Sequence, residues 1–270
     1  MTVPAWLLTI EYDGTDFVGF QRQARGRTVQ AELEAALARL FGQPVKTVGA
    51  GRTDTGVHAR GQAVSFRADR EFPPERLVAA LNYYLPPDIA VLRARRVPEG
   101  FNARRAAISR HYQYVVFTRP TRSPFWRRFA YHAAGPFDLG RMQWGADRLV
   151  GRRDFGVFSP GAVGRLNTVR TLLRAGVRAD GELIKFDFEA DAFLPHQVRM
   201  MVGTLLRLGQ GRLEPAEFEA VLTGHGQAGP AVPGCGLYLM GVSYPKWVEE
   251  YENEDLPFQT DRGRTALACD

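Results

Sequence analysis

The chain has 270 residues, 45% hydrophobic and 24% charged, which is enough for one large globular domain or two small ones. Two cysteines cannot build a disulfide framework or a multi-cysteine zinc site, and the apolar run WLLTI ends at Glu11. We therefore expect neither a signal peptide nor a membrane span, and a cytoplasmic location. The net charge of +6, carried almost entirely by arginine, favours a polyanionic partner, although a GC-rich genome also produces an arginine bias.

In the first half of the chain, the spacing of the apolar residues alternates between the period typical of a strand and the period typical of a helix. Residues 6–12 alternate as in a half-buried strand. Thr28 and Gly42 have the residue types of a helix N-cap and C-cap around VQAELEAALARLF. The predicted elements are a strand over 6–12, a helix over 28–42, strands over 44–50 and 61–68, a helix over 72–85 opened by Pro73 and Pro74, and a strand over 88–97.

The second half repeats this order. The predicted elements are a strand over 111–118, a helix over 138–151, a hairpin of strands over 168–179 and 182–193, a helix over 196–211 and a strand over 236–245. The hairpin is predicted to turn at Asp180 and Gly181.

Two repeats of strand, helix, strand, strand, helix, strand predict an α+β fold made of two split-βαβ (ferredoxin-like) halves. We expect the halves to join into one extended antiparallel sheet, with helices on one face and a basic RNA-binding cleft on the other. The predicted boundaries are 1–105 for an N-terminal lobe, 106–246 for a C-terminal lobe and 247–270 for an extended tail.

The stretch GAGRTDTGVHARGQ, between two predicted strands, surrounds Asp54 with glycines. Its spacing fits neither a dinucleotide fingerprint nor a Walker A loop, since Asp54 and Val57 stand where glycine and lysine are needed. A metal site is disfavoured, because Asp54 and His58 lack a ligand cluster of the usual spacing. Two interpretations stay open from the residues alone: a turn residue that caps a backbone N–H, and a reactive carboxylate to which glycines give a bulky substrate access.

Five segments of the sequence carry a resemblance to a known family: AGRTDTGVHARGQ, IEYDGTDFVGFQRQ, LNYYLPPDIAV, FNARRAAISRHYQYVV and FLPHQVRMMVGTLLRLGQG. With them the chain resembles the TruA family of tRNA pseudouridine synthases over nearly its whole length. The resemblance implies an isomerase that converts uridine to pseudouridine at positions 38 to 40, in the anticodon stem-loop of tRNA. It implies a homodimer with no cofactor and no metal. Phe20, Pro195, Gln197 and Met200 depart from the residues usual in the family.

The resemblance also assigns roles to four residues. It implies that Asp54 is the catalytic aspartate, that Tyr112 packs against the target uracil and that Arg199 pairs with Asp54. Arg52 is expected to displace the target base and take its place. For Tyr112, considered alone, core packing in a strand with Tyr114 is the alternative.

Basic residues near these motifs are further candidates. The predicted RNA-binding residues are Arg52, His58, Arg22, Arg60, Arg104 and Arg110. Each of the arginines could equally be a solvated surface residue. Two other functions stay open: a non-catalytic RNA-binding module, and a hydrolase that uses Asp54 to activate water and releases free uracil.

Overall fold

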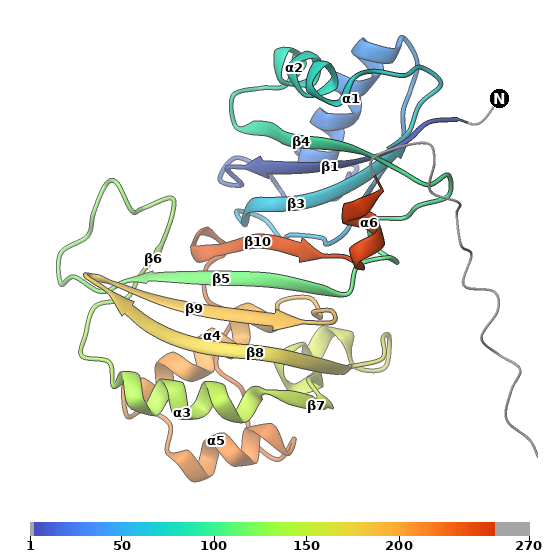
Figure 1. Ribbon diagram of the computed structural model, residues 1–270. Helices are drawn as coiled ribbons and strands as arrows, with labels where there is room; N and C mark the ends of the chain where they lie inside the picture. The colour runs from blue at the N-terminus through green and yellow to red at the C-terminus, as the bar shows by residue number, and fades with distance from the viewer. Residues whose placement is uncertain (1–2, 252–270) are drawn as a thin grey trace, which may run out of the picture.

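The computed structural model describes residues 3–251 and has a mixed α+β architecture (Figure 1). The strands are β1 (Ala5–Tyr12), β2 (Thr47–Gly49), β3 (His58–Arg67), β4 (Ile89–Val97), β5 (Ser109–Phe117), β6 (Tyr131–His132), β7 (Gly151–Asp154), β8 (Val169–Asp180), β9 (Leu183–Ala190) and β10 (Leu237–Ser243). The α-helices are α1 (Val29–Phe41), α2 (Pro74–Tyr84), α3 (Leu139–Leu149), α4 (Gln197–Gly209), α5 (Pro215–Leu222) and α6 (Lys246–Glu250). Short 3₁₀ turns are η1 (Gly156–Phe158), η2 (Pro160–Ala162) and η3 (Gly234–Gly236).

The strands form one large sheet in the order β4-β1-β3-β10-β5-β9-β8-β7, with β2 paired to β3 and β6 paired to β5. Most neighbouring strands run antiparallel. Among the described strands, β10 runs parallel to β3, and β6 runs parallel to β5. The last strand, β10, lies between β3 of the first half and β5 of the second (Figure 1). The two halves of the chain are therefore joined edge to edge through β10.

Local sequence signals account for the helix ends. The Thr28 side chain accepts a hydrogen bond from the Ala31 N–H at 3.3 Å, and Gly42 ends α1 in a left-handed conformation. Pro74 opens α2, as predicted, and β8 and β9 turn through Gly181 with a φ of +58°. Helix α5 was not predicted, although Glu214, Pro215 and Glu217 form a capping box with proline in the first turn.

One apolar core runs through both halves of the sheet. It includes Leu8 of β1, Leu33 of α1, Tyr114 of β5 and Val202 of α4, all buried. The α1 and α2 helices lie over the first half of the sheet, and α3, α4 and α5 over the second (Figure 1). Among residues 3–251, no helix is long and apolar enough to cross a membrane.

Helix α6 is a difference from the prediction, which made residues 247–270 an extended tail. Val248 of α6 is buried in a small cluster with Leu7 and Ala63. Leu7 alternates with the core residue Leu8 along β1, so α6 packs on the opposite face of the sheet from α1 and α2. The rest of the predicted tail, 252–270, lies outside the described residues.

Candidate active site

The loop that carries Asp54 joins β2 to β3 and is held by hydrogen bonds from several elements. The Gln62 side chain donates to the Gly51 carbonyl at 2.7 Å, and the Tyr12 and Thr53 hydroxyls are 2.8 Å apart. Gly56 turns the chain with a φ of +74°, a conformation that favours glycine. The carboxylate at position 54 is therefore presented from a well-anchored backbone.

Two glycines before α1 allow a neighbouring segment to pack directly on this loop. A Cβ atom at Gly14 would lie 2.0 Å from the Val57 carbonyl oxygen, and one at Gly19 would lie 2.7 Å from the Thr53 carbonyl oxygen. No side chain fits at either distance, so glycine is needed there for close backbone approach. The predicted motifs around Gly14 and Asp54 thus form one unit in space.

Asp54 faces two cationic or titratable side chains from the second half of the chain. Its Oδ2 is 3.1 Å from Nη1 of Arg199 and 3.6 Å from Nε2 of His196. The Asp54 side chain is 33% exposed and the Arg199 side chain 18%. Among the described residues, no backbone N–H donates to this carboxylate, so Asp54 is arranged for interaction with side chains rather than for capping the turn.

Arg199 lies in the first turn of α4 and is fixed at a second point. Its Nε donates to the Val232 carbonyl at 2.6 Å, while Nη1 donates to Asp54. Val232 N–H in turn donates to the Arg199 carbonyl at 3.3 Å. Because the guanidinium is planar, these two hydrogen bonds set the direction from which it meets the carboxylate.

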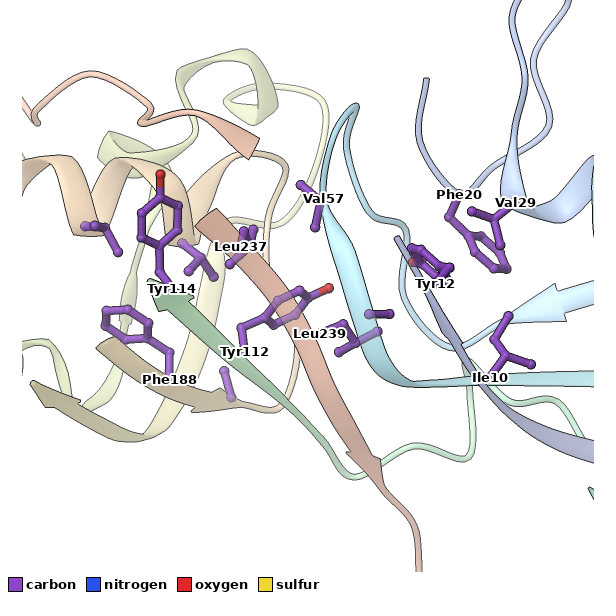
Figure 2. Packing of buried hydrophobic residues seen from close by; sticks show 14 of the residues in the cluster. Ile10, Tyr12, Phe20, Val29, Val57, Tyr112, Tyr114, Phe188, Leu237 and Leu239 are labelled. Atoms are coloured by element: carbon purple, nitrogen blue, oxygen red, sulfur yellow. The ribbon is translucent and has the colours of Figure 1, made fainter. Parts of the chain in front are cut away.

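Tyr112 lies on β5 and is 7% exposed. Its ring is nearly perpendicular to the ring of Phe193, with the two centroids 5.2 Å apart, and Figure 2 shows it beside Leu237 and Leu239 of β10. Burial raises the pKa of its hydroxyl, with smaller contributions from Tyr12 and then Asp54. The hydroxyl therefore stays protonated at neutral pH, and among the described residues it has no hydrogen-bond partner.

Asp54, Arg199 and Tyr112 line one hollow of about 380 Å³ between the β2–β3 loop, β5 and the start of α4. Arg52, Arg104, Leu166 and Arg170 are also on its wall. Tyr112 shares one face of β5 with Tyr114, and both belong to the core that packs against α4. The hollow is therefore on the face of the sheet against which α4 packs.

The model of the tRNA pseudouridine synthase family matches residues 8–104 and 146–245 of this chain. A tRNA pseudouridine synthase A of Neisseria gonorrhoeae is 42% identical over 243 residues, which cover 89% of this chain and 92% of that protein. The chain belongs to the tRNA pseudouridine synthase family.

Other members of the family are similarly close. The tRNA pseudouridine synthase A of Pelobacter propionicus is 41% identical over 239 residues, covering 88% of this chain and 98% of that protein. A more distant structural similarity, with a TM-score of 0.34 and 10% identity, extends to the archaeal box H/ACA sRNP Nop10-Cbf5 complex and covers 74% of this chain and 44% of that chain.

In this member of the tRNA pseudouridine synthase family, His58 does not fit its predicted contact with RNA. The side chain is 2% exposed and stacks against the ring of Tyr238. Its Nδ1 accepts from the Gly14 N–H at 3.0 Å, and its Nε2 lies 2.9 Å from the Arg128 carbonyl, to which it donates. Burial lowers the pKa of His58, and the Asp13 carboxylate, whose Oδ1 lies 3.2 Å from Nδ1, opposes this shift. With both ring nitrogens bonded to backbone groups, His58 is a structural element inside the protein.

Arg110 also differs from its predicted role. It lies on the wall of the hollow but is only 8% exposed, and its guanidinium donates to backbone carbonyls. Its donors are thus directed at the protein, and the predicted contact with RNA does not fit.

The other predicted RNA-binding arginines are exposed, but they do not all lie at the same hollow. Arg52 and Arg104 line the hollow, and Arg52 Nε donates to Gln21 at 3.1 Å. Arg22 pairs with Glu34 at 3.1 Å and is outside the hollow. Arg60 lines a different hollow of about 560 Å³, with Phe125 and Tyr238.

His196 and Phe193 were missed by the sequence reasoning. His196 precedes α4 in a left-handed conformation, with a φ of +61°, which brings its ring near Asp54. Its closeness in sequence to Arg199, three residues later, was an available signal. Among the described residues, no three His, Cys, Asp or Glu side chains are placed to hold a metal ion.

Proposed function

We propose that this chain isomerises uridine to pseudouridine at positions 38 to 40 of the anticodon stem-loop of tRNA. Its membership of the tRNA pseudouridine synthase family supports this assignment. The observation that carries it is the partly exposed carboxylate of Asp54, 3.1 Å from Arg199 on the wall of a hollow that also contains Tyr112. A binding module has no use for such an acid where RNA phosphates must approach.

The reaction breaks the bond between uracil N1 and ribose C1′ and forms a bond between C5 and C1′, with the C5 hydrogen lost to solvent and one proton taken up at N1. No electrons are gained or lost, so the residues need only assist cleavage and hold the freed ring. Asp54 is the catalytic residue: its carboxylate adds to C1′ or to ring C6, or supports removal of the C2′ proton. All three routes need a carboxylate that points towards the nucleotide. The role of Arg199 is to hold the Asp54 carboxylate in that direction.

The target base must leave its stack before Asp54 can reach it, at a cost of a few kcal/mol. Stacking on an aromatic ring returns about 1–3 kcal/mol per base. Tyr112 provides this surface in the hollow, and its protonated hydroxyl is available to the uracil. Arg52, exposed on the same wall, is positioned to occupy the space that the base vacates.

The protein as a whole acts as two lobes, 1–105 and 106–246, in a cytoplasmic homodimer. The order β4-β1-β3-β2 in the first lobe and β10-β5-β9-β8 in the second supports two split-βαβ units of the same design. The RNA enters along the hollow between the β2–β3 loop and α4, where Arg52, Arg104 and Arg170 supply positive charge. Sedimentation of the full chain tests the dimer.

The function is tested with an in vitro transcribed tRNA and carbodiimide labelling, which marks pseudouridine as a stop in primer extension. The expected result is a new stop at one or more of positions 38 to 40 after incubation with the full chain. Release of free uracil would identify a hydrolase instead. Binding of the tRNA without any stop or released base would identify a binding module.

A further inference from the structure

Arg110 is a buried cation whose charge the proposed chemistry does not use. It lies on β5, two residues before Tyr112 and on the same face of that strand. The residue is 8% exposed, and among the described residues no carboxylate lies within ion-pairing distance of its guanidinium. Such a group is stable in a protein interior only when its donors are all directed at acceptors.

The acceptors of Arg110 are backbone carbonyls from separate parts of the chain. Nη2 donates to Arg104 at 2.7 Å and to Ala50 at 3.1 Å, and Nε also faces the Ala50 carbonyl at 3.4 Å. Nη1 donates to Asp191 at 2.7 Å and to Ala107 at 3.2 Å. One side chain thus holds four carbonyl groups.

These carbonyls belong to the segments that lead into the active site. Ala50 begins the loop that carries Asp54, 60 residues from Arg110 in sequence. Asp191 follows β9 and begins the connection to α4, which carries Arg199. Arg104 and Ala107 lie in the connection between β4 and β5, and Arg110 itself shares its strand with Tyr112.

We infer that Arg110 is a positioning residue that fixes the distance between the Asp54 loop, Tyr112 and the β9–α4 connection. This inference rests on the proposed function. Lysine cannot replace the guanidinium, because one ammonium group with three donors cannot reach carbonyls on two sides at once. A misplacement of about 1 Å among reacting groups lowers rates by up to about 100-fold.

The test compares wild type with Arg110→Lys and Arg110→Gln in single-turnover reactions at saturating tRNA. Arg39→Lys, an exposed arginine of α1, is the matched control. Arg110→Lys is expected to react about 10- to 100-fold more slowly at saturation, while its Kd for tRNA and the salt dependence of that Kd stay within twofold of wild type. Arg39→Lys is expected to match wild type in the saturating rate, in the Kd for tRNA and in the salt dependence of that Kd.

Hydrogen exchange gives a readout that does not depend on catalysis. In Arg110→Lys the amides of 50–56 and 191–196 are expected to exchange faster than in wild type, and in Arg39→Lys they are expected to be unchanged. Arg110→Lys keeps the charge and can be judged even if Arg110→Gln does not fold.

Two results would overturn the inference. A normal saturating rate with normal exchange in Arg110→Lys would show that the guanidinium positions nothing. A normal saturating rate with weaker binding and a shallower salt dependence would make Arg110 an RNA contact. Failure of wild type to form pseudouridine would instead contradict the proposed function, so the two failures are distinguishable.

Discussion

Nη1 of Arg199 lies 3.1 Å from Oδ2 of Asp54, although 145 positions separate the two residues in the sequence. The contact joins the first helical turn of α4 to the loop between β2 and β3. Because each residue is anchored by its own backbone contacts, the pair is brought together by the fold of both halves of the chain.

The Arg199 side chain has two partners that lysine cannot serve together, Asp54 and the Val232 carbonyl. Arg199→Lys is expected to lower the single-turnover rate about 100-fold, and Arg199→Ala at least as much, with little change in the Kd for tRNA. Arg207→Lys, on the same helix, is the control and should react as wild type. A wild-type rate in Arg199→Lys would show that the orientation of the carboxylate does not depend on a guanidinium.

Gly14 is required by packing, whereas Gly176 has open space around it. Gly14→Ala must displace the Val57 carbonyl, next to the Asp54 loop, and is expected to lower the free energy of unfolding by about 1–3 kcal/mol and to reduce turnover. Gly176→Ala is expected to change the free energy of unfolding by less than about 0.5 kcal/mol. Urea denaturation of both variants checks this, and equal stabilities would contradict the close approach of the two segments.

Buried tyrosines predict a loss of stability at alkaline pH. Burial raises the pKa of five tyrosines above the ordinary value of 10.0: Tyr12, Tyr112, Tyr114, Tyr238 and Tyr244. Above pH 10 the unfolded chain releases these protons and the folded chain keeps them, so the free energy of unfolding falls as pH rises. The slope is about 1.4 kcal/mol per pH unit for each tyrosine that stays protonated.

Tyr112→Phe should reduce this alkaline slope, since it removes one of the five groups without breaking a hydrogen bond among the described residues. Tyr83→Phe is the control, because that ring is 84% exposed. Denaturation at pH 9, 10 and 11 gives the slopes. If the Tyr112 and Tyr83 variants behave alike, the hydroxyl of Tyr112 ionises normally and is not buried in solution.

Arg104 and Arg22 are predicted to differ in their effect on RNA binding. Arg104 lines the hollow, while Arg22 lies outside it and pairs with Glu34. Arg104→Gln should lower the slope of log K against log salt by about one unit, the effect of losing one phosphate contact. Arg22→Gln should change it much less. Filter binding at several salt concentrations measures both slopes. A larger effect of Arg22→Gln than of Arg104→Gln would indicate that the RNA passes near the start of α1 instead.

Much of the fold follows from local patterns in the sequence. The caps at Thr28 and Gly42 and the turn at Gly181 place α1 and the β8–β9 hairpin because they act within a few residues. The position of β10 between β3 and β5 depends on pairing between distant segments, which periodicity does not encode. Helix α6 was missed because it is only five residues long and too short to show a period.

For the site, the sequence motifs and the family resemblance placed Asp54, Tyr112 and Arg199 together, and the structure brings all three to one hollow. Their catalytic roles stay predictions. The expected RNA contacts of His58 and Arg110 do not fit, because residue type and loop position do not reveal burial. Both side chains are buried and hydrogen-bonded to backbone groups of the protein. His196 was missed because its approach to Asp54 depends on a left-handed backbone conformation, which its residue type does not indicate.

Tritium release from a tRNA labelled at C5 of uridine, measured with wild type and Asp54→Asn in parallel, tests whether Asp54 is the catalytic carboxylate. Asn has nearly the same shape as Asp but no charge, so folding and tRNA binding should be retained. We expect wild type to release tritium and Asp54→Asn to release none above background. Equal release by both proteins would show that Asp54 is not the catalytic carboxylate.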